Sequence, residues 1–259
     1  MGNFYFDETI QAKAGFTIGA FIYSDSDLSS IVFSALERSG LTPTVDEFKS
    51  GAHMASNPQQ AWLRDHISAL LSCVKVGVVV TPADDRSTLG AEALCGLEKI
   101  LRANSLEKQH HKVFFDEGIY ITLAIQESFL SSVGTCCELY LSQNSKIVGG
   151  IQVADLAAHS LGVMLLEQLG LISKKVRAGE NSGYDPDLEI ELGFELWASL
   201  RYSFFMASQP KSDSIPDDPV GEMIYDVENF GLYISPSCTE QLKKAAIERF
   251  GKCYLGCIH

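Results

Sequence analysis

The sequence predicts an α/β protein with a mixed sheet, in which an antiparallel hairpin precedes strands that alternate with helices. Strand-like and helix-like segments alternate from about residue 42 onward, which is typical of a layered domain with a largely parallel sheet. Before them, apolar segments at 3–7 and 15–24 are joined by a short turn region that suits a hairpin. With 259 residues, 46% of them hydrophobic, the chain can bury a full core.

A helix and a third strand are predicted after the hairpin. Residues 27–41 have the pattern of a helix, with Asp27 as a plausible N-cap and Gly40 as its stop. Residues 44–50 ("TVDEFKS") alternate in side-chain character, which indicates a strand.

The next helix, at 57–74, has Asn57 as its cap and Pro58 at its first position. Strands and helices then alternate with little interruption. The expected elements are a strand at 75–85, a helix at 88–106, a strand at 111–118, a helix at 122–132 and a strand at 136–143.

The segment 149–170 predicts a helix that is apolar almost all round and therefore buried. Its polar exceptions Gln152, Asp155 and His159 fall at i, i+3 and i+7, which places them on one stripe of the helix. A carboxylate in such a helix is costly to bury unless it is paired or binds a cation. Asp155 therefore needs a partner.

The chain changes in texture beyond residue 170. We expect an α/β domain over 1–170 and a mainly helical appendage over 171–259, packed on that domain. The appendage is predicted to contain an amphipathic helix at 188–205 and a last helix that starts with a capping box of Ser237 and Glu240.

The net charge of −13 argues against strong binding of nucleic acid by the chain alone, because such binding depends on Lys and Arg. The densest basic stretch, 173–179, is expected to be a solvated loop. No apolar run approaches the roughly 20 residues of a membrane span, and the N-terminus lacks a signal-peptide pattern. We expect a cytoplasmic protein without a membrane partner.

The seven cysteines are expected to be reduced thiols rather than a disulfide framework. Cys253, Cys257 and His259 would supply only three zinc ligands, with no fourth nearby. A thiol enzyme that uses Cys136 or Cys137 is disfavoured, because adjacent cysteines in a buried strand are usually inert.

Acidic residues follow two predicted strands and project from the buried helix. Asp7 and Asp116 end apolar runs, and ligands collect at the carboxyl ends of strands in open α/β sheets. Together with Asp155 they would repel one another unless they took up protons or bound a cation. Clustered carboxylates suit Mg²⁺ or Mn²⁺, and a two-ion site would support hydrolysis of a phosphate ester.

A two-ion site needs three or four carboxylates, and Glu47 is the best fourth candidate. Lys49, on the same face of the possible third strand, would then meet a substrate phosphate. The alternative is that Asp7 and Asp116 simply start turns and that Asp155 forms an ion pair, for example with an Arg.

The order of these motifs, "FYFDET", "EFK", "VFFDEG" and "GGIQVADLAAH", resembles the bacterial and phage family called domain of unknown function 3800. The resemblance covers about residues 3 to 165 and implies a ribonuclease H-like fold. It places the acidic site residues of the family on Asp7, Glu47, Asp116 and Asp155, with Glu8 as a further member. The first motif departs from the common Asp-Glu-Ser-Gly, which affects the turn that follows but keeps both acids.

The function expected from this resemblance is a metal-dependent nuclease or phosphodiesterase with a nucleic acid or nucleotide substrate. The alternative is a catalytically silent binding or regulatory module of the same fold that acts through a protein partner. Retention of all four acids favours catalysis, whereas the acidic composition favours the silent module. Fold alone does not decide between them.

Overall fold

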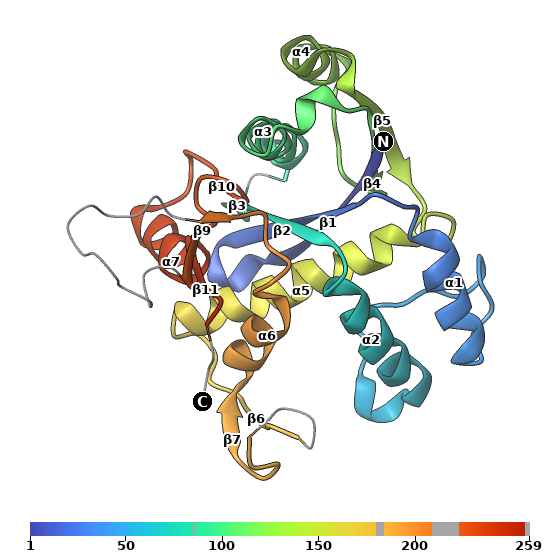
Figure 1. Ribbon diagram of the computed structural model, residues 1–259, viewed down its shortest axis with the longest axis vertical. Helices are drawn as coiled ribbons and strands as arrows, with labels where there is room; N and C mark the ends of the chain where they lie inside the picture. The colour runs from blue at the N-terminus through green and yellow to red at the C-terminus, as the bar shows by residue number, and fades with distance from the viewer. Residues whose placement is uncertain (85, 180–183, 209–222, 257–259) are drawn as a thin grey trace.

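The computed structural model describes residues 1–84, 86–179, 184–208 and 223–256, and its centre is a six-stranded mixed sheet (Figure 1). Strands β1 and β3 run antiparallel to β2, whereas β4 is parallel to β1, β5 to β4 and β10 to β3. The prediction of an α/β chain with a mixed sheet is confirmed. The strands lie, in order across the sheet, as β10 (Leu232–Ile234), β3 (Lys75–Pro82), β2 (Phe16–Ser24), β1 (Gly2–Gln11), β4 (His111–Asp116) and β5 (Cys137–Gln143).

The first two strands form the predicted hairpin and stay in register along their whole length. A turn of 3-10 helix, Ala12–Ala14, joins them, and Gly15 follows with a φ of 75°. Glycine adopts this left-handed conformation without steric cost, which allows the chain to reverse here. The first strand is longer than predicted, because it continues through Asp7 as far as Gln11.

Helices cover both faces of the sheet, which separates two hydrophobic clusters (Figure 1). None of the helices in the described ranges is long and apolar enough to cross a membrane. One face carries α3 (Leu89–Ala103) and α4 (Leu123–Val133), and the other carries α1 (Ser29–Arg38), α2 (Pro58–Leu71), α5 (Gly150–Gln168), α6 (Leu192–Leu200) and α7 (Glu240–Phe250).

The β1 side chains alternate between these two clusters, as the pleat of a strand requires. Phe4 and Phe6 belong to the cluster under α3 and α4, whereas Tyr5 belongs to the cluster under α5. Asp7 therefore projects toward α5.

The backbone of α5 lies directly against the hairpin because two of its residues lack a side chain. A Cβ atom added at Gly150 would lie 2.5 Å from the ring of Tyr5, and one added at Gly162 would lie 2.8 Å from Cγ2 of Thr9. This close approach brings the buried helix of the sequence prediction over β1.

The residues after α5 form more than the mainly helical appendage that was expected. Strand β10 completes the edge of the central sheet by pairing with β3, so this segment is built into the α/β layer. The other short strands are β6 (Lys175–Arg177) with β7 (Glu189–Glu191), and β8 (Ala207–Ser208) with β9 (Ile224–Asp226) and β11 (Lys252–Tyr254).

Two local predictions for this segment are wrong. The helix expected at 188–205 is confined to α6, because the residues before it pair with β6 instead. The last helix is capped by Thr239, whose side chain accepts from the N–H of Leu242, rather than by Ser237. Thr239 has the extended backbone that an N-cap needs, with a ψ of 153°.

Candidate functional site

Asp7 and Asp116 lie on neighbouring parallel strands. Strands β1 and β4 pair as far as Phe6 and Phe115, so Asp7 and Asp116, at the next position, lie side by side. Both project on the face where the rings of Tyr5 and Phe114 stack at 5.3 Å, because side chains alternate along each strand. Neighbouring strands are only about 4.8 Å apart, so the two carboxyl groups share one small region.

Asp155 faces this region from α5. The helix packs on β1 with Gly150 against Tyr5 and with Gly162 further along the strand. Asp155 lies between these two contacts, as Asp7 does on β1. The Asp155 carboxylate is close enough to contribute to the raised pKa of Asp7. The structure therefore brings together the three acids on which the sequence analysis depends.

The segment 44–50 is an irregular loop, so its prediction as a strand is wrong. The ring of Phe48 is 1% exposed, and its N–H donates to Oε1 of Gln152 in α5 at 2.7 Å. Gln60 of α2 hydrogen bonds to the main chain on either side of Phe48. Because two glutamine side chains satisfy this backbone, the loop needs no neighbouring strand.

Glu47 and Lys49 project from this loop beside the aspartates. The Glu47 carboxylate lies 3.2 Å from Nζ of Lys49 and accepts a hydrogen bond from Ser145. Although burial lowers it, the pKa of Lys49 is raised overall by Glu47 and then by Asp155 and Asp116. The ammonium group of Lys49 is thus close to these acids.

Asp155 is held by the same loop. Ser50 donates its N–H to Oδ2 of Asp155 at 2.9 Å and its hydroxyl to Oδ1 at 2.5 Å. No Lys or Arg of the described ranges forms an ion pair with Asp155. A neutral serine is therefore its partner, and not the arginine considered from sequence.

Glu8 faces the opposite side of the sheet, because it follows Asp7 on an extended strand. Its carboxylate lies 3.5 Å from Nη2 of Arg86, in the segment before α3. Its N–H donates to Oδ1 of Asp7 at 2.8 Å. Burial raises the pKa of Glu8, while the hydrogen bond with Asp7 and the charge of Arg86 oppose this increase. Glu8 is thus the ion-pair partner of Arg86 at the edge of the site.

The aspartates of the two strands hold protons more tightly than exposed carboxyl groups do. Burial raises the pKa of Asp7 well above its usual value, and the charges of Asp116, Asp155 and Glu8 raise it further. Burial also raises the pKa of Asp116 to about 6, despite a hydrogen bond from Glu117 and the charge of Lys49. Such carboxyl groups have too little positive charge near them to offset the effect of burial on their ionised forms.

These residues fit a hard divalent cation in chemical type but are not arranged as a closed set of ligands. All the candidate donors are carboxylates, which Mg²⁺ and Mn²⁺ prefer. In the described part of the chain, however, no three His, Cys, Asp or Glu side chains converge as a metal site. Ser50 holds both oxygens of Asp155, and Lys49 and Ser145 hold Glu47. Before they could bind a metal ion, Asp155 and Glu47 would have to lose these partners.

The cysteine alternatives gain no support. Cys136 and Cys137 are buried, and burial raises the pKa of Cys137, which disfavours the reactive thiolate. Cys253 is also buried, and its thiol donates to the carbonyl oxygen of Arg201. Cys257 and His259 lie outside the described residues.

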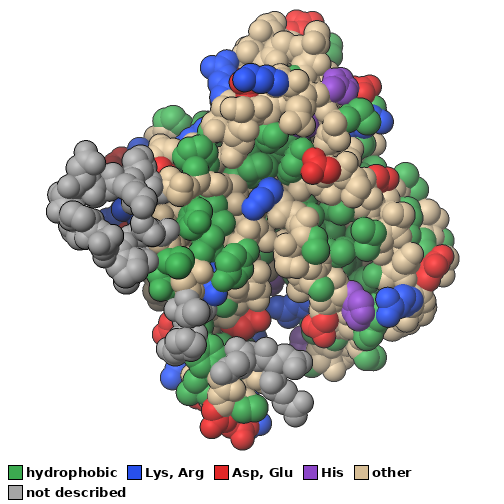
Figure 2. All heavy atoms as spheres, viewed as in Figure 1, with side chains coloured by type: hydrophobic (Ala, Val, Ile, Leu, Met, Phe, Trp, Pro, Cys, Tyr) green, Lys and Arg blue, Asp and Glu red, His purple; other side chains and the backbone are tan. Residues whose placement is uncertain are grey.

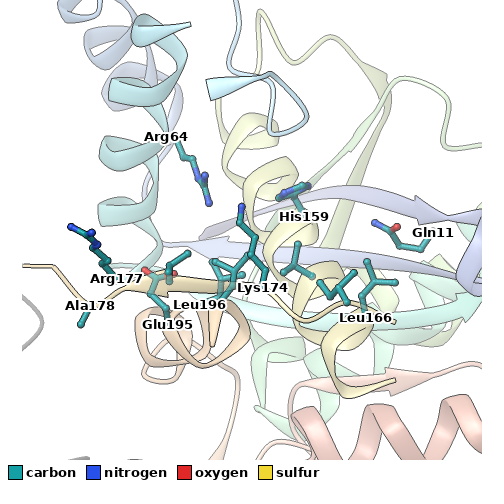
Figure 3. Close-up of a pocket in the computed structure, with 13 residues that line it drawn as sticks. Gln11, Arg64, His159, Leu166, Lys174, Arg177, Ala178, Glu195 and Leu196 are labelled. Atoms are coloured by element: carbon teal, nitrogen blue, oxygen red, sulfur yellow. The ribbon is translucent and has the colours of Figure 1, made fainter. Parts of the chain in front are cut away.

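Sequence reasoning missed a cavity of about 580 Å³ beside the acids. Lys174 and Arg177, from the stretch expected to be a solvated loop, line it together with Arg64 of α2 (Figure 3). His159, already noted one turn after Asp155, lies on its wall. The lining comes from segments far apart in the chain, and only the density of positive charge at 173–179 pointed toward it.

Comparison with models of known protein families and with curated proteins gives no match to this chain. The class that the fold and the site define is an α/β protein with a mixed six-stranded sheet and a partly buried group of carboxylates. Any narrower statement about activity is a proposal.

Proposed function

We propose that this chain is a Mg²⁺- or Mn²⁺-dependent phosphodiester hydrolase, a nuclease of the ribonuclease H-like type, with a nucleic acid or nucleotide substrate. The observation that carries the proposal is the proximity of Asp7, Asp116 and Asp155, which come from two parallel strands and a facing helix. The raised pKa values of Asp7 and Asp116 support it, because they mark carboxyl groups that a cation would stabilise.

The architecture is compatible with this proposal. The central sheet is mixed, with an antiparallel three-stranded part and parallel strands on the far side of β1, and helices cover both faces. The resemblance of the motifs to domain of unknown function 3800 points to the same fold. Since one fold hosts many functions, the argument depends on the carboxylates and not on the sheet.

The residues have distinct roles in the proposed reaction. Asp7, Asp116 and Asp155 would hold the ions, with Glu47 as a fourth ligand once Lys49 and Ser145 release it. When bound, such ions lower the pKa of an attacking water and stabilise the leaving oxygen. Lys49, freed from Glu47, would bind an oxygen of the substrate phosphate.

A catalytically silent module is the second candidate, and one observation favours it. Asp155 and Glu47 are already satisfied by the two serines and Lys49, so the site is stable as a hydrogen-bonded network without metal. Such a protein would use its acidic surface to meet a basic partner protein.

The test combines metal binding with cleavage. Mn²⁺ should raise the melting temperature of the wild type, because a ligand that binds only the folded state stabilises it. Single-stranded RNA and DNA should be cleaved in Mn²⁺ and not in EDTA. Asp7→Asn and Asp116→Asn should lose both effects, whereas Asp65→Asn, at an exposed acid on α2, should keep both.

Two results would decide against the nuclease. Wild-type protein that shows neither a Mn²⁺-dependent melting shift nor cleavage supports the silent module. Cleavage that survives Asp7→Asn and Asp116→Asn at the wild-type rate would assign the activity to other residues or to a contaminant.

A further inference from the structure

The cavity beside the acids is lined by α2, α5, α6 and the segment around β6 (Figure 3). Its volume of about 580 Å³ is within the range of small-molecule sites. The surface is hollowed between α2 and α6 in the space-filling view as well (Figure 2). The cavity is therefore open to a ligand from solvent.

Two cations meet in this cavity without an ion pair in the described ranges, although Glu195 of α6 also lines it. Burial raises the pKa of Glu195, and the charge of Arg64 opposes this increase. Figure 3 shows the guanidinium of Arg64 and the ammonium of Lys174 pointing toward one another. Neither makes an ion pair with any residue of the described ranges, although acidic residues outnumber basic ones by 33 to 20. Converging like charges repel, and an anion between them would remove that cost.

Three further polar side chains line the cavity. Two of them are His159 and Gln11, and the Gln11 amide lies near Gly162. Arg177 is at the rim, where it pairs with Asp187 at 3.3 Å. Arginine and lysine together are the side chains that proteins use to bind phosphate oxygens.

Apart from Glu195, the rest of the wall is apolar, and it includes Val163 and Leu166 of α5 and Leu196 of α6. A ligand with one strongly charged end and one flat, weakly polar end matches this combination of cations and apolar side chains. A nucleotide, with its phosphate and its base, has that composition.

We propose that this cavity binds a nucleotide through a terminal phosphate group, with Arg64 and Lys174 as the phosphate ligands and the apolar wall beneath the base. Where it names a substrate, the inference rests on the proposed function. His159, on the cavity wall, lies one helical turn from Asp155 on the same stripe of α5, which places the cavity next to the proposed metal site. A nucleic acid strand whose end occupies the cavity would extend toward the carboxylates of Asp7, Asp116 and Asp155. The ligand is either a free nucleotide or the phosphorylated end of a strand.

Calorimetric titrations of the full chain in EDTA test binding without hydrolysis. Adenosine 5′-monophosphate should bind at least about tenfold more tightly than adenosine, because hydrogen bonds to a charged phosphate are stronger than those between neutral groups. Inorganic phosphate should bind more weakly than the nucleotide, because it leaves the apolar wall uncovered. A 5′-phosphorylated tetranucleotide, compared with its unphosphorylated form, distinguishes a strand end from a free nucleotide.

Variants connect the binding to the two cations. Arg64→Gln and Lys174→Gln should each weaken nucleotide binding about tenfold, and Arg64→Lys should restore much of it. Lys175→Gln is the matched control, since Lys175 is the exposed next residue of the chain and does not line the cavity. Equal binding of nucleotide and nucleoside, or unchanged binding in both glutamine variants, would overturn the inference.

The carboxylate variants separate this inference from the proposed function. Asp7→Asn should bind the nucleotide in EDTA as the wild type does, even though its cleavage activity is lost. If no activity exists but the cavity binds nucleotides, only the proposed hydrolysis fails. If cleavage occurs and neither the nucleotide nor the phosphorylated strand binds, the cavity inference fails alone.

Discussion

Asp155 shows how one polar residue in a buried helix can be satisfied without a salt bridge. The helix around it is apolar, and the carboxylate depends on the main chain and the hydroxyl of Ser50. That arrangement leaves its negative charge without an ion pair in the described ranges and close to Asp7. The hydrogen bonds from Ser50 therefore fix the position of the Asp155 carboxylate, while its charge repels that of Asp7 and lowers the stability of the fold.

Asp155→Asn should leave the metal-free protein as stable as the wild type or more stable. The asparagine oxygen accepts from the N–H of Ser50, its amide donates to the serine hydroxyl, and one of the repelling charges is gone. Thermal melts in EDTA and in Mn²⁺ check this, with Asp65→Asn as the control. The Mn²⁺ shift should be smaller in the variant, and cleavage should vanish. A variant that melts far below the wild type in EDTA would show that the charge itself stabilises the fold.

The pH dependence of stability provides a second test at this scale. A carboxyl group whose pKa rises on folding stabilises the fold below its unfolded pKa, and this contribution is lost as the pH rises through the folded value, about 6 for Asp116. In EDTA, lowering the pH from about 8 to about 5.5 should therefore favour the wild type relative to Asp116→Asn. Urea unfolding of both proteins at each pH measures the difference. A gap that does not change with pH would contradict the raised pKa.

The elements predicted from sequence are those with a long, regular pattern. The hairpin, the buried strands β3 and β4 and the helix α5 all follow hydrophobic periodicity, which local side chains determine. Residues 44–50 alternate as a strand does, but long-range hydrogen bonds from Gln60 and Gln152 hold them as a loop. A pattern of seven residues carries no information about such partners.

The contact between α5 and β1 can be tested at Gly150. A Cβ atom there would lie 2.5 Å from the ring of Tyr5, so the helix must shift away from the strand. Gly150→Ala should lower the free energy of unfolding by about 1–3 kcal/mol, as overpacking in a core does. Gly51→Ala is the control, since nothing lies within 4 Å of the added atom. Equal urea midpoints for the two variants would show that α5 does not pack closely on β1.

At the scale of the molecule, charge restricts what the chain binds. Lys and Arg side chains are scattered over the face shown in Figure 2, with acidic and hydrophobic side chains between them. The converging pair of Arg64 and Lys174 lies in a cavity and would reach a single nucleotide rather than the length of a duplex.

The purified chain should therefore bind a long DNA duplex only weakly, with a dissociation constant above about 10 μM at physiological salt, in the range of non-specific binding. Fluorescence anisotropy with a labelled duplex measures this, and a phosphorylated short oligonucleotide serves as the comparison. Tight binding of the duplex that weakens steeply with salt would reveal a basic surface outside the faces considered above.

Only part of the candidate site could be predicted from the sequence, because some of its residues are brought together by segments that lie far apart in the chain. Asp7 and Asp116 end apolar runs within strands and Asp155 lies in a buried helix, so their local patterns mark them. Arg64 and Lys174 have no such mark, because their meeting depends on how α2 and the segment after α5 fold over the sheet. The short β10 was missed for the same reason, since it is a strand only by virtue of pairing with β3.

The pairing of β10 with β3 also affects how the chain is made. Leu232 pairs with Val78, so β3 remains an edge strand on the ribosome until most of the polypeptide has been synthesised. Buried valines at 78, 79 and 80 would then present unpaired backbone groups to other nascent chains, as exposed edges of apolar strands do. Aggregation during synthesis, rather than low stability of the finished protein, is the hazard that this late strand creates.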